Sequence, residues 1–282
     1  MRLASFTLDG RAGYGAVEGD MVLDLTGRLP APSLKEALAD LPALRAALPD
    51  APRRPLAAVA LCPPIGNPDK IWMVGLNFLH HVKETGREIP KYPSLFTRYP
   101  DSIVGHGEPL IRPRVSQKFD YEGELTVVIG TPGRHIPAGR ALDHVAGYTL
   151  CNDGSIRDYQ RHTIQFTPGK NFWRSGSVGP WIVTADEIPD PAALSIETRL
   201  NGRTVQQSSI GDLIFPVPDL IAYISSFTPL AVGDLIAIGT PSGVGAFREP
   251  PLWMKPGDSV EVIVDGIGTL RNGILDEADP AS

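Results

Sequence analysis

Apolar and polar positions alternate in short runs along most of the chain, and turn residues separate the runs. Such runs predict short strands, because successive side chains of a strand point to opposite faces. The expected strands lie at 3–8, 21–23, 71–74, 119–129, 145–151, 178–183, 194–200, 235–238 and within 259–274. Asp9-Gly10, Asn201-Gly202 and Asp265-Gly266 are hairpin signals between runs. The pattern predicts a β-rich α+β fold.

Helical spacing is limited to a few segments. Ser33-Leu34-Lys35-Glu36 is a capping box that predicts a helix as far as about Leu48. Asn152 or Asp153 is expected to cap a helix that begins near Ile156. The other expected helices cover residues 79–85 and 220–227.

A proline-rich segment at 51–66 follows the first helix and indicates a linker. We therefore expect a small N-terminal α/β domain with its linker at residues 1–66. A larger catalytic domain is expected at residues 67–282.

Composition restricts the class of protein. The net charge of −6 without a basic stripe argues against nucleic acid as a partner. The first residues lack the apolar run of a signal peptide, and no apolar run of about 18 residues could span a membrane. The only cysteines, Cys62 and Cys151, lie far apart in sequence and indicate a reducing compartment. We expect a cytoplasmic protein.

Two carboxylates stand out in the apolar strand at 119–129. Glu122 and Glu124 share one face of this strand, where burial without a positive partner would be costly. Asp153 follows the next apolar strand and reaches the same place if the two strands are neighbours. Three carboxylates without cysteine or histidine form an all-oxygen site that suits Mg²⁺ or Mn²⁺, with Ca²⁺ also possible. The alternative is that these acids are exposed on an edge strand or paired with Arg157.

Other candidates are weaker when taken alone. His81 and Glu84 are three residues apart on a helix, so the carboxylate can orient the imidazole as a general base. The pattern alone favours a solvated helix in which His81 is incidental. Lys170, on a Pro-Gly loop, could bind a substrate carboxylate or an oxyanion. The same holds for Arg157 and Gln160, although most such residues are ordinary surface residues.

Four segments together resemble the fumarylacetoacetate hydrolase (FAH) family. Residues 75–84, GLNFLHHVKE, resemble its GxNYxxHxxE motif, and residues 120–130, DYEGELTVVIG, resemble its DYEGELxVVIG strand. Residues 147–160 resemble GYxxxNDxSxRDxQ, and residues 239–245 resemble GTPxGVG. The segments occur in the family's order. The chain resembles the acylpyruvase-like and 2-hydroxyhepta-2,4-diene-1,7-dioate isomerase-like members.

The resemblance implies a mixed β-roll of the FAH C-terminal kind after a small N-terminal domain, and a homodimer. By motif position it implies metal ligands, catalytic residues and substrate contacts. The implied metal ligands are Glu122, Glu124 and Asp153, and the implied catalytic residues are His81, Glu84 and Lys170. The implied substrate contacts are Arg157, Gln160 and Thr240. Some positions depart from the family pattern. Arg98 stands where members often carry lysine, and Gly154 is a minor departure after Asp153. After Lys170, Asn171 stands where serine or glycine is common and Trp173 stands where aspartate is common.

The family's chemistry gives a first hypothesis. It is a divalent-metal-dependent hydrolase that cleaves the C–C bond of a 2,4-dioxo acid through a metal-bound enolate. The substrate would be of the acylpyruvate, fumarylpyruvate or diketo-deoxy sugar acid type. His81 with Glu84 would activate water, and Lys170 would steady the oxyanion.

Two alternatives remain open. A decarboxylase or isomerase of 2-oxo or 2-hydroxy-diene-dioates in aromatic catabolism would use the enolate without the water. A non-catalytic sugar-acid-binding homologue is a third hypothesis, against which the complete set of acids, histidine and lysine argues.

Overall fold

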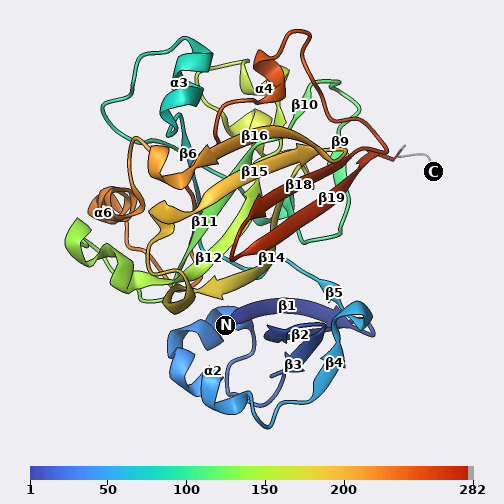
Figure 1. The fold of residues 1–282 in the computed structure, drawn as a ribbon, viewed down its shortest axis with the longest axis vertical. Coiled ribbons are helices and arrows are strands. Elements are labelled where there is room, and N and C mark those ends of the chain that lie inside the picture. Colours follow the sequence, from blue (N-terminus) through green and yellow to red (C-terminus); the bar gives the residue numbers. More distant parts are fainter. Residues whose placement is uncertain (279–282) are drawn as a thin grey trace.

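A sheet of twelve strands runs through the protein (Figure 1), for which a computed structural model describes residues 1–278. In spatial order its strands are β4 (Arg53–Pro55), β3 (Met21–Asp24), β2 (Arg11–Glu18), β1 (Arg2–Leu8), β14 (Gly176–Thr184), β12 (Val145–Asn152), β11 (Gly123–Ile129), β17 (Leu235–Ala237), β6 (Ile71–Gly75) and β7 (Ser94–Thr97). At its sides, β5 (Ala60–Leu61) pairs with β1 and β8 (Ile103–Val104) pairs with β14. The antiparallel pairing of β1 with β14 makes the N-terminal strands part of the same sheet.

A second sheet covers one face of the long one. Its strands are β16 (Arg203–Ser209), β15 (Ser195–Leu200), β18 (Ser259–Val264), β19 (Gly268–Asp276) and β9 (Leu110–Arg112). In Figure 1 the β15–β19 part of this sheet crosses β11, β12 and β14. Leu125 and Val127 of β11 pack into one core with Val262 of β18 and Leu270 of β19. A short ladder joins β10 (Phe119–Asp120) to β13 (Ser155–Ile156). The predicted β-rich α+β class is confirmed.

Helices are short and lie around the sheets. They are α1 (Leu34–Ala37), α2 (Leu41–Ala47), α3 (Leu79–Thr85), α4 (Arg157–Gln160), α5 (Thr167–Lys170) and α6 (Val217–Phe227). The expected helix at 79–85 is present, and the one at 220–227 begins three residues earlier than expected. The helix expected from Ser33 to Leu48 is interrupted at residues 38–40, because the Asp40 side chain caps a new helix at the Ala43 N–H and Pro42 occupies its first turn.

Three further local predictions are wrong. The segment 51–66 is more than a linker, since it carries β4 and β5 of the long sheet. Neither Asn152 nor Asp153 caps the next helix: no side chain caps α4. Lys170 ends the single turn α5 instead of lying on an irregular loop. The division of the chain at residues 66 and 67 stays a prediction.

The alternation along β11 decides which side chains reach the site. Leu125 and Val127 face the second sheet, so Glu124 faces away from it. Gly123 lies against the second sheet, where a Cβ would come within 2.1 Å of the Thr198 hydroxyl. The close approach of the sheets therefore requires glycine between the two glutamates. Within the described part of the chain, no helix is long and apolar enough to cross a membrane.

Candidate active site and metal centre

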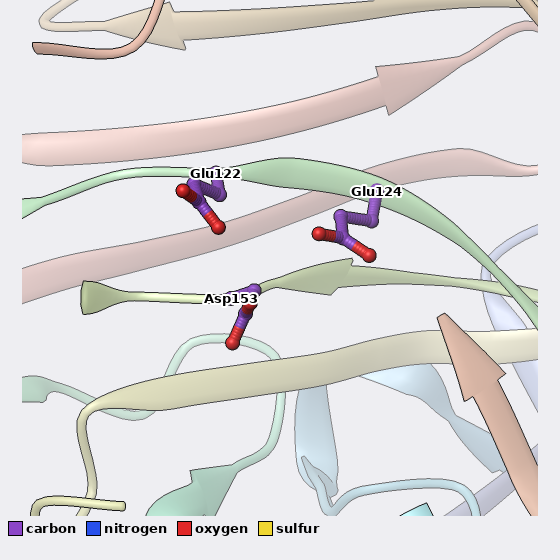
Figure 2. A group of neighbouring side chains, drawn as sticks. All are labelled: Glu122, Glu124 and Asp153. Atoms are coloured by element: carbon purple, nitrogen blue, oxygen red, sulfur yellow. The ribbon is translucent and has the colours of Figure 1, made fainter. Parts of the chain in front are cut away.

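Three carboxylates meet where β11 and β12 lie side by side (Figure 2). Glu122 precedes β11, Glu124 lies within it, and Asp153 follows β12. The antiparallel register places Gly123 opposite Asn152, and the Asp153 N–H donates to the Glu122 carbonyl at 2.8 Å. One oxygen from each acid lies within 4.8 Å of the others, and all three side chains are buried. The expected meeting of these acids is therefore present in the structure.

Two cations sit directly against this triad. Nζ of Lys170 lies 2.5 Å from Oε2 of Glu122 and 2.6 Å from Oδ2 of Asp153. Nη2 of Arg157 lies 2.6 Å from Oε1 of Glu122. The alternative that paired Glu122 with Arg157 is thus correct as a contact, but the acids are neither exposed nor on an edge strand. We call Glu122, Glu124, Asp153 and Lys170 the pocket floor.

The glutamates of the floor differ in their electrostatics. Burial would raise the pKa of Glu122, but Arg157 and Lys170 outweigh it and hold this pKa well below its usual range. Burial raises the pKa of Glu124 well above its usual range, and the charges of Asp153 and Glu122 add to the effect. Within residues 1–278, the Glu124 carboxylate accepts one N–H group, from Gly239 at 2.9 Å, and forms no ion pair with a side-chain cation. Glu124 is therefore the acid that still lacks a positive partner.

This arrangement fits a hard divalent cation. The donors are all carboxylate oxygens, which Mg²⁺ and Mn²⁺ accept, and three protein ligands would leave positions for water or substrate. A cation beside Glu124 would also compensate its buried charge. The residues present thus suit the expected cofactor on the chemistry of the donor set and on the unmatched acid.

The second cluster is the pair His81 and Glu84 on α3. Nδ1 of His81 lies 2.8 Å from Oε2 of Glu84, as the spacing of three residues predicts. Oε1 of Glu84 accepts the N–H of Gly243 at 2.9 Å, so the carboxylate is fixed from both sides. His81 is only 6% exposed, which rules out the solvated-helix alternative. Since Nδ1 is engaged with a carboxylate, Nε2 is the nitrogen left for chemistry.

The predicted substrate contacts lie close by. Nη1 of Arg157 donates to Oε1 of Gln160 at 2.9 Å, and Nε of Arg157 donates to Oδ2 of Asp120 at 2.7 Å. The Thr240 hydroxyl donates to the Gly123 carbonyl at 3.1 Å and accepts from Gln206 at 2.8 Å. Arg157 and Thr240 are thus held in place by other side chains.

A single pocket of about 460 Å³ joins these groups. Of the nine residues expected in the site, eight line it, and Glu84 contacts it through His81. Its outer wall carries Arg87, Arg161, Ile164 and Phe247, which we call the pocket rim. The Arg161 guanidinium lies 5.8 Å from the Phe247 ring centroid. Neither rim arginine pairs with an acidic side chain within residues 1–278.

Three buried residues of the site were not expected. Arg98 contacts Asp153, Asp120 contacts Arg157, and Gln206 contacts Thr240. Asp120 also accepts the N–H groups of Gly245 and Ala246. Asp120 lies within the strand motif, and Arg98 was noted as a departure from the family pattern. No local signal in the sequence marked Gln206.

Two known protein families match most of the chain. Residues 70–275 match the family described as "Fumarylacetoacetate (FAA) hydrolase C-terminal", and residues 1–64 match one described as "Rv2993c-like, N-terminal". The chain belongs to the fumarylacetoacetate hydrolase family. The family is enzymatic, so the resemblance and the expectation of an enzyme are confirmed at this level.

Individual relatives differ in activity. The human "Oxaloacetate tautomerase FAHD2A, mitochondrial" is 41% identical over 235 residues, which are 83% of this chain and 74% of the relative. The fumarylacetoacetate hydrolase of Exiguobacterium antarcticum is 37% identical, with a TM-score of 0.89 over 98% of this chain and 100% of that one. The maleylpyruvate hydrolase of Sphingobium sp. SYK-6, solved with manganese(II) and pyruvate, is 29% identical, with a TM-score of 0.84 over 99% and 100%.

These likenesses confirm the fold, the FAH C-terminal kind of β-roll, together with the expectation of a divalent metal cofactor. A related structure holds manganese, and this chain has a buried acidic triad that can bind such an ion.

Proposed function

We propose that this enzyme is a divalent-metal-dependent hydrolase that cleaves the C–C bond of a 2,4-dioxo acid. The observation that carries the proposal is the position of the oriented His81 in the same pocket as the acidic triad. A metal-loaded acid triad without a base would bind a 2-oxo acid, but it would not activate water for attack on the distal carbonyl.

The pocket floor would hold the cofactor. Glu122, Glu124 and Asp153 are the proposed ligands. The ion would supply Lewis-acid polarisation of the 2-oxo group and so stabilise the enolate of the leaving 2-oxo acid. Lys170 and Arg157, already at the floor, would bind the anionic oxygens of the substrate. Thr240 and Gln160 would position the remaining oxygens.

His81 would perform the proton transfer. With Nδ1–H donating to Glu84, Nε2 can take a proton from water. The resulting hydroxide would add to the C4 carbonyl, and the C3–C4 bond would then break. Its electron pair would go to the 2-oxo fragment as an enolate, which takes up a proton at C3. The products would be a 2-oxo acid such as pyruvate and a carboxylic acid.

A second candidate is tautomerisation of oxaloacetate. The 41% identity to a protein named as an oxaloacetate tautomerase favours it. It would use the same floor and the same enolate, and His81 would carry a proton between C3 and the 2-oxygen. No water would be consumed, and no C–C bond would break. Isomerase and decarboxylase activities on related dioates belong to the same mechanistic group.

One experiment separates these candidates. The purified enzyme with Mn²⁺ is given acylpyruvates and oxaloacetate, and the decay of enol absorbance is followed together with product analysis. Hydrolysis predicts equal amounts of a 2-oxo acid and a carboxylic acid, whereas tautomerisation predicts faster enol–keto exchange without products of cleavage. Turnover that persists in excess chelator would contradict both.

The assembly and the location stay proposals as well. We infer a homodimer from the family resemblance, and light scattering on the purified protein would test it. A cytoplasmic location stays a prediction, and the human relative is named as mitochondrial.

A further inference from the structure

Arg98 lies directly behind the pocket floor. It follows β7, its side chain is fully buried, and Nη1 lies 2.7 Å from Oδ1 of Asp153. A buried arginine is stable only when its charge and its donors are all matched. The groups that surround the Arg98 guanidinium therefore indicate its role.

All five N–H donors of Arg98 have acceptors. Nη1 donates to Asp153 at 2.7 Å and to the Gly154 carbonyl at 3.0 Å. Nη2 donates to the Ser175 hydroxyl at 2.8 Å and to the Ser102 carbonyl at 3.2 Å. Nε donates to the Ser102 hydroxyl at 3.2 Å. Such a set matches the planar guanidinium and no other side chain, since lysine has three donors around one point.

The backbone is shaped to accept this plane. A Cβ on Gly176 would lie 2.6 Å from Cζ and Nη2 of Arg98. The guanidinium thus packs directly against the backbone of Gly176. This contact fixes its orientation together with its hydrogen bonds. Asp153 receives a donor whose position does not vary.

The two oxygens of Asp153 consequently have different partners. Oδ1 is held by Arg98, whereas Oδ2 is contacted by Lys170 on the side of Glu122. Lys170 also contacts Glu122, so its ammonium lies between two of the proposed ligands. Oδ2 is the Asp153 oxygen that a cation at the floor would meet.

We propose that Arg98 is a positioning residue for metal binding. Its hydrogen bond to Oδ1 fixes the Asp153 carboxylate, so that Oδ2 would point toward the cation. The inference rests on the proposed metal site. Without Arg98, the buried Asp153 would lose its fixed rotamer, and the ligand oxygen would have to be ordered at the moment of binding. Partners that orient a metal ligand are worth about 10- to 100-fold in affinity.

The test measures Mn²⁺ affinity of the whole protein by calorimetry, with Arg98→Met and Arg98→Lys as variants. Arg98→Met should weaken binding about 100-fold. Arg98→Lys should weaken it about 10-fold, because lysine restores the positive charge but not the planar set of guanidinium hydrogen bonds. The matched control is Arg112→Lys, which alters a surface pair of Arg112 with Asp276 that also has two contacts, at 2.7 and 3.0 Å. The control should leave Mn²⁺ affinity unchanged.

A merely structural arginine would give another result. Both variants would then melt at lower temperature while binding Mn²⁺ as the native protein does, and that outcome overturns the proposal, as would tighter binding. If Arg98→Met does not fold, unchanged affinity in Arg98→Lys is sufficient to overturn it. Failure of the native protein to bind Mn²⁺ instead rejects the metal site itself, so the two failures are distinguishable.

Discussion

The floor and the rim of the pocket hold their charges in opposite ways. At the floor, Glu122, Asp153 and Lys170 are buried, and each has an oppositely charged partner within hydrogen-bond distance. At the rim, Arg87 and Arg161 are exposed and have no acidic partner in the described chain. The three acids of the floor lie on or next to the adjacent strands β11 and β12, whereas the two rim arginines follow the short helices α3 and α4. Fixed charges suit chemistry that must be preorganised, and free charges suit a ligand that brings its own.

From this difference we infer that the floor and the rim determine different properties of the enzyme. Reaction type would depend on the floor and on the oriented His81, which the rigid sheet and α3 position. The choice among acyl groups would depend on the rim, where the chain presents cations and apolar side chains together. Substitutions should therefore cause large losses at the floor and modest, substrate-dependent changes at the rim.

The largest effect is expected at Glu124. Glu124→Gln removes the acid that lacks a cation and should abolish tight Mn²⁺ binding. Activity should fall by about a thousandfold or more, because Lewis-acid stabilisation is worth several kcal/mol. Calorimetry and steady-state kinetics measure the two losses. Glu197→Gln, which alters a glutamate of β15 paired with Arg199, serves as control and should change neither.

The next effect is expected at the dyad. His81→Ala should lower C–C hydrolysis by about 10²- to 10⁴-fold while Mn²⁺ affinity stays close to native, because general-base catalysis is lost and the ligands remain. His80→Ala is the matched control, since His80 is the exposed neighbour on the same helix. Full hydrolysis of every active acylpyruvate by His81→Ala would contradict the assignment of the base.

A smaller effect is expected from pH. The raised pKa of Glu124 means that a proton competes with the metal, so Mn²⁺ affinity should fall as pH decreases below that pKa. The slope should approach a factor of about 10 per pH unit, with one proton released on binding. Calorimetry in buffers of different ionisation enthalpy counts this proton. Mn²⁺ affinity that does not change with pH would show that Glu124 does not exchange a proton for the metal.

The smallest effect is expected at the rim. Arg161→Met should raise KM roughly three- to tenfold for substrates with a distal carboxylate and leave kcat unchanged, because an exposed ion pair is worth about 1 kcal/mol. Neutral acylpyruvates should show no change. Arg11→Met, at an exposed arginine of β2 that does not line this pocket, is the control. An equal loss for charged and neutral substrates would remove the proposed role of the rim.

Much of the floor followed from local sequence. Extended backbone from Glu122 into β11 places Glu122 and Glu124 together because strand geometry fixes the face of each side chain. The spacing of His81 and Glu84 gives their contact because a helix brings residues three apart to one side. Asp153 required one assumption, that the two apolar strands pair, and their register shows that they do.

Two other features differ from the predictions, one for a local reason and one for a tertiary reason. The expected single helix from Ser33 to Leu48 is broken, since the Asp40 cap and Pro42 prevail over apolar spacing. The segment 51–66 joins the sheet because β4 pairs with the outer edge of β3, and β5 pairs with the end of β1 that β14 does not cover. The helix break follows from a cap and a proline that the local sequence carries, whereas the strand pairing of 51–66 follows from tertiary contacts that composition does not reveal.

The sequence by itself determined the shared face of Glu122 and Glu124, the contact of His81 with Glu84 and the β-rich class, because these depend on periodicity within single elements. Only the tertiary structure decided which cations match the acids. Lys170, Arg157 and Arg98 come from three separate segments, and their contacts exist because the packing of sheet and helices brings those segments to one point. A buried charge needs a partner, but its own sequence neighbours do not say which residue that partner will be.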